Sequence, residues 1–180
     1  MACALAGLAF AGVSAAASAA TGETWAIAPS ANGMFSVETP CTEAEVVGFR
    51  SLPDEMVPEL KFIPGSRVVC RRGQVILVAA EVGDPDYPKT GLSVFDSIVE
   101  QAKGDKTAEG TPTITTLNGR RAFVNRQEKD AMLAQTGFVE IDRGRIIMLI
   151  AGVQADSGLS VKDQGALIDR FYSSVKVTGK

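Results

Sequence analysis

Four arginines flank two tight turns that the sequence predicts, and they are the residues best placed for binding chemistry. They are Arg120, Arg121, Arg143 and Arg145. A guanidinium group binds a carboxylate or a phosphate through paired, charge-assisted hydrogen bonds. If both turns lie at the same end of the sheet, these arginines form a basic cluster that could bind a small anion or an acidic partner surface. The alternative is that they are solvated and paired with Asp142 or Glu140.

Catalytic chemistry has little support in this sequence. The chain contains no histidine, which removes the usual base of serine and cysteine hydrolases and the commonest ligand of zinc and copper. Nucleophile-elbow, dinucleotide-binding and P-loop motifs are absent as well. We therefore expect no catalytic residues, no metal site and no cofactor. An enzyme of unrecognised type that uses carboxylates and arginines is the alternative.

The first 19 residues have the pattern of a removable signal peptide. No charge precedes Glu23, an apolar core covers residues 3–13, and an A-x-A cleavage site ends at Ala19. The core is too dilute in strongly apolar residues to span a membrane. The usual basic opening is missing, so an alanine-rich helix packed on the domain is the alternative. We expect residues 20–180 to form a single domain in the periplasm or outside the cell.

Signal cleavage would remove Cys3 and leave Cys41 and Cys70. Two cysteines in an oxidising compartment are a natural pair, so we expect a disulfide between them. Two free thiols are the alternative. A thiol–disulfide enzyme is not expected, because no C-x-x-C motif is present.

Turn residues divide much of the chain into short strands. Asn-Gly at 118–119 and Arg-Gly at 72–73 and 143–144 each separate two strand-like runs, which predicts three hairpins. Residues 41–65, which hold three prolines, are expected to be a crossing loop with one irregular strand near 45–50. The expected strands are residues 35–38, 67–71, 74–82, 111–117, 120–127, 136–142 and 145–153, and the segment 174–177 closes the fold.

Two capping patterns predict two helices. Ser93 and Ser160 are each followed three residues later by an aspartate, as in a capping box. In the first helix, which should end by Gly104, one apolar face is expected. Its residues are Leu92, Phe95, Val99 and Ala102. The second helix has its apolar stripe at Leu167, Ile168 and Phe171.

The strands 74–82 and 145–153 are apolar almost throughout, which is typical of central strands covered on both faces. Helices on both sides of such a sheet would provide that cover. The sequence therefore predicts an α+β fold, with a mostly antiparallel sheet and two main helices.

Three short segments resemble the PsbP-like (Mog/PsbP) α/β/α sandwich domains, as found in small exported bacterial proteins. They are residues 33–40 (GMFSVETP), 117–122 (LNGRRA) and 169–177 (DRFYSSVKV), within a likeness that spans about residues 25–178. The resemblance implies a binding or accessory role, typically through protein contacts, and no shared catalytic residues.

Composition sets limits on the partner. The formal net charge of −3 gives no reason to expect nucleic acid, which requires a basic excess. We expect an exported, non-catalytic binding or accessory module whose partner is an envelope protein or a small anionic ligand. A structural component of the cell envelope is a further alternative.

Overall fold

The structure, a computed structural model, describes residues 24–42, 62–83, 87–88, 90–104 and 110–178. The strands in these residues are β1 (Ala26–Pro29), β2 (Phe35–Thr39), β3 (Phe62–Arg72), β4 (Val75–Gly83), β5 (Thr111–Leu117), β6 (Arg120–Lys129), β7 (Met132–Glu140), β8 (Arg145–Val153) and β9 (Lys176–Val177). The helices are α1 (Val94–Gly104) and α2 (Val161–Ser173), with a 3-10 turn at Ala155–Ser157. The expected signal peptide and the irregular strand near 45–50 lie outside the described residues.

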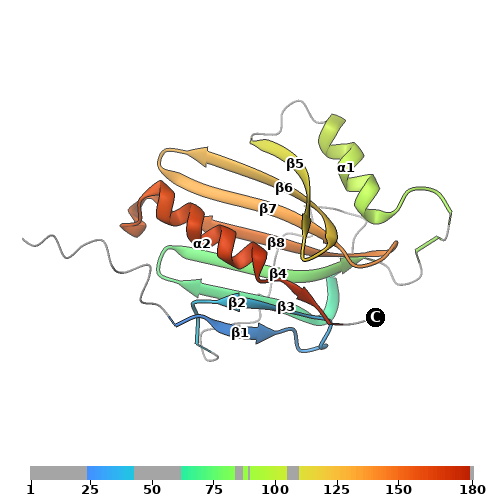
Figure 1. Cartoon of the computed structure of the whole chain (residues 1–180), viewed down its shortest axis with the longest axis horizontal. Coiled ribbons are helices and arrows are strands. Elements are labelled where there is room, and N and C mark those ends of the chain that lie inside the picture. Colours follow the sequence, from blue (N-terminus) through green and yellow to red (C-terminus); the bar gives the residue numbers. More distant parts are fainter. Residues whose placement is uncertain (1–23, 43–61, 84–86, 89, 105–109, 179–180) are drawn as a thin grey trace, which may run out of the picture.

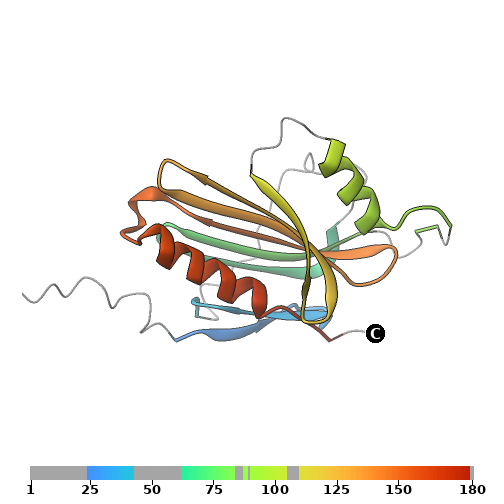
Figure 2. The same ribbon diagram turned by 45° about the horizontal axis from the view of Figure 1, so that its top comes forward.

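A six-stranded antiparallel sheet forms the centre of the fold, in the order β3-β4-β8-β7-β6-β5 (Figure 1). A smaller sheet, β1-β2-β9, lies beside α2 on one face, and α1 packs on the other (Figures 1 and 2). The predicted α+β class, with a mostly antiparallel sheet and two main helices, is confirmed.

The central strands are apolar on both faces because each face of the large sheet has its own core. In β8, Ile147 and Leu149 pack in the core on the α2 side, whereas Ile146 and Met148 pack in the core on the α1 side. All four side chains are at most 3% exposed. The prediction that residues 145–153 form a strand covered on both faces is confirmed.

Serine caps begin both helices. The Ser93 hydroxyl accepts from the backbone N–H of Asp96 at 3.0 Å, and the Ser160 hydroxyl accepts from that of Asp163 at 3.2 Å. These bonds satisfy a backbone donor that the first helical turn leaves open. One detail of the first helix was wrong: Leu92 precedes the cap and is 56% exposed, and Ile98 is buried on the apolar face instead.

Two strands, β3 and β7, begin earlier than the sequence predicted, and a third, β1, was missed. Strand β1 is a short edge strand with the sequence AIAP. It has no alternation of apolar and polar residues by which a strand could be predicted. Strand β3 begins at Phe62, within the region expected to be a loop, because an irregular register up to Arg67 accommodates Pro64 without a ladder hydrogen bond. The expected loop therefore ends earlier than residue 65.

A fourth hairpin, between β6 and β7, was also missed. It turns at Asp130 and Ala131, both with positive φ (50° and 62°), without the glycine that usually marks such a turn. The predicted turn at 118–119, by contrast, has positive φ at Asn118 (49°) and Gly119 (78°), as a type I′ hairpin requires.

Candidate functional site

The two arginine-bearing turns lie side by side at one end of the six-stranded sheet, because β6 and β7 pair with Ala122 opposite Val139. They border a cavity of about 520 Å³, which we call the turn-end pocket. Its charged lining residues are Arg120, Arg121, Arg143, Asp96, Glu140 and Asp142. The structure thus brings three of the four arginines together and adds an equal number of carboxylates.

Arg121 is held by two carboxylates and an aromatic ring. Its Nη2 donates to Asp96 Oδ1 at 2.5 Å, and its Nη1 lies 3.4 Å from Glu140 Oε2. The guanidinium carbon stands 4.6 Å from the centre of the Phe95 ring. The Arg121 side chain is still 50% exposed, so it is both fixed in position and accessible.

Arg120 and Arg143 bind backbone carbonyls rather than carboxylates. Nη1 of Arg120 donates to the carbonyl of Ile141 at 2.7 Å, which joins the two turns. Nε of Arg143 donates to the carbonyl of Pro88 at 2.8 Å, and its Nη2 donates to that of Gly91. Arg143 thereby fixes the segment that leads into α1.

Arg145 does not line the pocket and has a structural role. Its Nη1 lies 3.1 Å from Oε1 of Glu81, a carboxylate that is only 1% exposed, and its Nη2 lies 2.6 Å from Asp142. Glu81 also accepts from Nδ2 of Asn32 at 2.9 Å. A buried carboxylate requires such partners, so Arg145 stabilises the fold at this end of the sheet.

The carboxylates of the pocket are stabilised in their charged form. Hydrogen bonds from Arg121 and from Ser93 lower the pKa of Asp96 below its ordinary value. Partial burial acts to raise the pKa of Asp142, but hydrogen bonds from Arg145 and the N–H of Gly144 outweigh it and lower that pKa. Neither group is poised to carry a proton near neutral pH.

These shifts predict a sensitivity to acid. A carboxyl whose pKa is lower in the folded than in the unfolded chain stabilises the fold above its unfolded pKa. This contribution is lost as the pH falls below the ordinary value of 3.8 and through the folded pKa. We therefore expect the Asp96→Asn variant to lose less thermal stability than the wild type between neutral pH and pH values below 3.8. Thermal unfolding followed by circular dichroism across that range measures the difference, and parallel curves for both proteins would contradict it.

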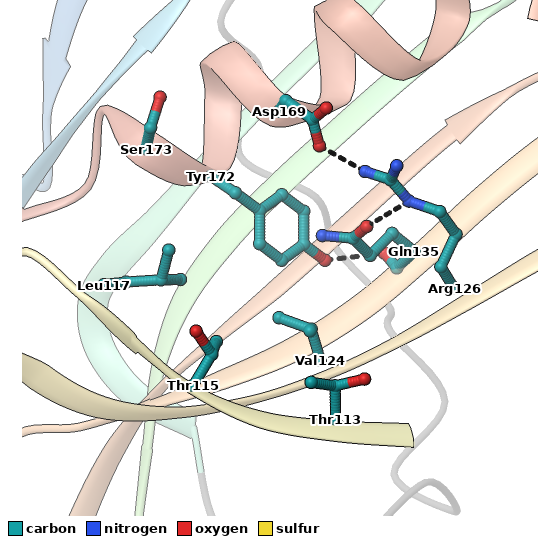
Figure 3. A pocket seen from close by; sticks show the side chains of 9 residues that line it. All are labelled: Thr113, Thr115, Leu117, Val124, Arg126, Gln135, Asp169, Tyr172 and Ser173. Carbon is teal, nitrogen blue, oxygen red and sulfur yellow. Dashed lines mark hydrogen bonds and ion pairs between the residues drawn. The ribbon is translucent and has the colours of Figure 1, made fainter. Parts of the chain in front are cut away.

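Helix α2 and the curved β5–β6 hairpin are seen in Figure 2. A second concave surface, which we call the α2 groove, lies between them (Figure 3). Six strands span about 24 Å and a helix covers about 10 Å, so α2 leaves the β5–β6 end of this face open. The groove has a volume of about 400 Å³. At the end of the groove lined by Leu117 and Ser173, Asn118 links the hairpin to the segment after α2. Its Nδ2 donates to the carbonyl of Ser173 at 2.9 Å and to that of Val175.

Tyr172 forms the floor of the α2 groove. Its ring lies against the sheet at Gly137, where a Cβ would stand 2.6 Å from the Tyr172 Cε1. The Tyr172 hydroxyl lies 2.7 Å from the carbonyl of Gln135 and 2.9 Å from that of Leu149. Burial holds the pKa of Tyr172 well above its ordinary value, against the opposing influence of Arg126 and the Gln135 hydrogen bond. The phenol is therefore neutral and cannot serve as a base.

Arg126 lies at the other end of the groove, opposite Leu117 (Figure 3). Its Nε donates to Oε1 of Gln135 at 2.6 Å, and its Nη2 donates to Asp169 of α2 (Figure 3). Arg126 and Gln135 face each other across β6 and β7 in the observed register. The ion pair with Asp169 links the sheet to the helix.

None of the groove residues was a candidate from the sequence. Arg126 and Gln135 meet only through the β6–β7 hairpin, whose turn was not recognised. One local signal was present: Gly137 interrupts a strand, and a glycine there often marks the close approach of another group.

The expected disulfide is present between Cys41 and Cys70, with 29 residues of separation and Cα atoms 5.7 Å apart. Both cysteines are at most 2% exposed. The bond ties the end of β2 to β3 and thus joins the small sheet to the large one.

In the part of the chain that the structure describes, no helix is long and apolar enough to cross a bilayer. Over the same residues, no group of three histidine, cysteine or acidic side chains is arranged to hold a metal ion.

Comparison with known proteins places the fold. No family model matches the sequence, and no curated protein matches it. Among solved structures, the chain is similar to the solution structure of cyanobacterial PsbP (CyanoP) from Synechocystis sp. PCC 6803, with a TM-score of 0.50 and 14% identity. The match covers 96% of this chain and 98% of that one. Together with the sheet order and the two helices, this similarity shows that the chain has the PsbP-like fold that its short motifs predicted.

Proposed function

We propose that this chain is an exported, non-catalytic binding or accessory module that contacts a protein partner through the turn-end pocket. The proposal depends on one observation: Arg120, Arg121 and Arg143 share a single cavity and are each held in place by fixed partners. Arginines with fixed geometry lose little conformational freedom on binding and are common energetic centres of protein interfaces.

The charge balance of the pocket favours a protein over a small anion. Its three arginines face Asp96, Glu140 and Asp142, so the site as a whole is close to neutral. An isolated phosphate would have to displace two carboxylates from Arg121, or backbone carbonyls from Arg120 and Arg143. A protein surface can instead meet the positive and negative groups with charges of its own, which is the basis of electrostatic specificity.

Two further observations support the proposal. The lowered pKa values of Asp96 and Asp142 keep these groups ionised near neutral pH, and the raised pKa of Tyr172 keeps the phenol protonated, so none of the three is suited to proton transfer there, which argues against the enzymatic alternative. The buried disulfide is consistent with folding in an oxidising compartment outside the cytoplasm.

The test is affinity recovery from the native cell envelope followed by mass spectrometry, with the wild type, Arg121→Glu and Lys162→Glu compared. We expect Arg121→Glu to reduce recovery of the partner by about tenfold, as for a central interface arginine. Lys162 is the matched control, because it is an exposed cation in the first turn of α2 and does not line the turn-end pocket.

Three results would contradict the proposal. Equal recovery with Arg121→Glu and wild type would show that the pocket is not the contact surface. A rise in the thermal midpoint with inorganic phosphate, abolished by Arg121→Glu, would show that a small anion is the ligand. Recovery in the membrane fraction after a high-salt wash would favour the structural envelope component instead.

A further inference from the structure

We propose that the α2 groove is a second binding site, which takes an uncharged ligand carrying a hydrogen-bond-accepting oxygen, of the amide or carbonyl kind, next to an apolar group. The groove shares no lining residue with the turn-end pocket, so this inference is independent of the proposed function. Figure 3 shows the side chains that carry it.

The first observation is a hydrogen-bond donor, on a largely buried side chain, that faces the groove. Gln135 is 6% exposed, and its amide orientation is fixed by its neighbour. The Nε of Arg126 can only donate, so the atom 2.6 Å from it must be the Gln135 oxygen, Oε1. The NH2 group of Gln135 therefore points the other way, into the groove towards Tyr172 (Figure 3).

That NH2 group makes no hydrogen bond to another residue that the structure describes, and it is not one of the fully buried polar atoms that lack a partner, so it meets solvent in the groove. A donor on a largely buried side chain that has no partner in the protein is a place where a ligand oxygen gains a hydrogen bond. A ligand atom there would replace solvent that now meets this group.

The second observation is the chemistry of the two walls. Thr113 and Thr115 of β5 present hydroxyl groups, and in Figure 3 that of Thr115 points into the groove. Leu117 and Val124 supply apolar surface between the two threonines and Tyr172, which forms the floor of the groove. The volume of about 400 Å³ is in the range of small-molecule sites, which combine apolar walls with a few placed polar groups.

The third observation is that the groove is electrically balanced. Its cation, Arg126, is paired with its anion, Asp169. A charged ligand would lose hydration without meeting an uncompensated opposite charge, and it would have to break this pair. An uncharged ligand avoids both costs.

The test is an NMR titration of the 15N-labelled protein with N-acetyl-leucinamide, an uncharged amide with an apolar side chain. We expect saturable shifts of the Gln135 side-chain amide, with a dissociation constant on the order of 1 mM for so small a molecule. N-acetyl-leucine, which carries a carboxylate, should bind more weakly. Tighter binding of the carboxylate, or no saturable shift at Gln135, would overturn the proposal.

Matched variants separate a binding role from a structural one. Thr115→Val removes a hydroxyl that faces the groove and should weaken binding about fivefold. Thr116→Val, on the opposite face of the same strand, should leave it unchanged. Gln135→Glu keeps an oxygen for Arg126 but removes the donor, and should weaken binding at least about tenfold. Equal losses in Thr115→Val and Thr116→Val would overturn the proposal.

The amide could belong to a free small molecule or to a peptide, and a further binding measurement, with a short peptide, distinguishes the two. Strand β5 is an edge strand of the large sheet. The register of the β5–β6 hairpin directs the backbone N–H of Thr116 away from β6, so this N–H is not used within the sheet. A peptide added to β5 would use that N–H. A capped alanine–leucine peptide that binds more tightly than N-acetyl-leucinamide, and loses this gain in Thr116→Pro, identifies a peptide source. No gain with the peptide identifies a free small molecule.

Discussion

Replacing both Cys41 and Cys70 by alanine lowers the free energy of unfolding by about 3.5 kcal/mol, because the unfolded chain regains the freedom that a closed loop of this length removes. The two cysteines are 29 positions apart in the sequence. For a chain of this size the loss corresponds to a fall in the thermal midpoint of about 10 °C. Urea unfolding of the wild type and of the double variant measures it.

A reductant provides the control for this prediction. Wild-type protein unfolded in the presence of a reductant should match the double variant, whereas the double variant should not respond to the reductant. The intact mass of the wild type should be lower by two hydrogens than that of the reduced protein. If the reductant leaves the wild-type midpoint unchanged, the disulfide contributes nothing to stability and the prediction is wrong.

Replacing Arg145 by methionine costs about 3 kcal/mol of unfolding free energy, because it leaves a buried carboxylate without its cation. That carboxylate is Glu81, which is 1% exposed, and Asn32 remains as a neutral partner. Methionine keeps the apolar stem of the arginine side chain, so the loss reports the charge rather than the packing. Chemical unfolding of Arg145→Met and wild type measures the difference.

Two comparisons make the Arg145 prediction specific. Adding Glu81→Leu to Arg145→Met should restore most of the lost stability, since the double variant no longer buries a charge. Arg121→Met should cost less than about 1 kcal/mol, because its acidic partners stay in contact with water. Asp96 and Glu140 are 35% and 21% exposed. If Arg121→Met costs as much as Arg145→Met, then burial of the carboxylate is not the cause.

This contrast matters for the proposed function. The sequence grouped Arg145 with three other arginines as one candidate binding cluster. In the structure, Arg145 contacts a residue 64 positions away and serves the fold, whereas Arg121 is half exposed in a cavity. Binding assays should therefore use Arg121 variants, since loss of binding in an Arg145 variant would report unfolding.

The sequence alone determined the features that depend on neighbours along the chain. Ser93 and Ser160 cap the helices because the aspartate N–H three residues later lies within reach of the serine oxygen. Asn118 and Gly119 adopt positive φ and so set a hairpin register. The unbroken apolar run of β8 required two covered faces, and Cys41 and Cys70, the two cysteines outside the apolar N-terminal segment, were the expected pair.

Only the tertiary structure decided the features that depend on register between distant strands. The Asp130–Ala131 turn carries no glycine, and without it nothing in the sequence places Arg126 opposite Gln135. The pairing of Arg145 with Glu81 and the open end of the sheet beside α2 arise in the same way. Local patterns encode backbone conformation, whereas a site depends on which side chains meet after the strands have paired, and that is settled by packing across the whole domain.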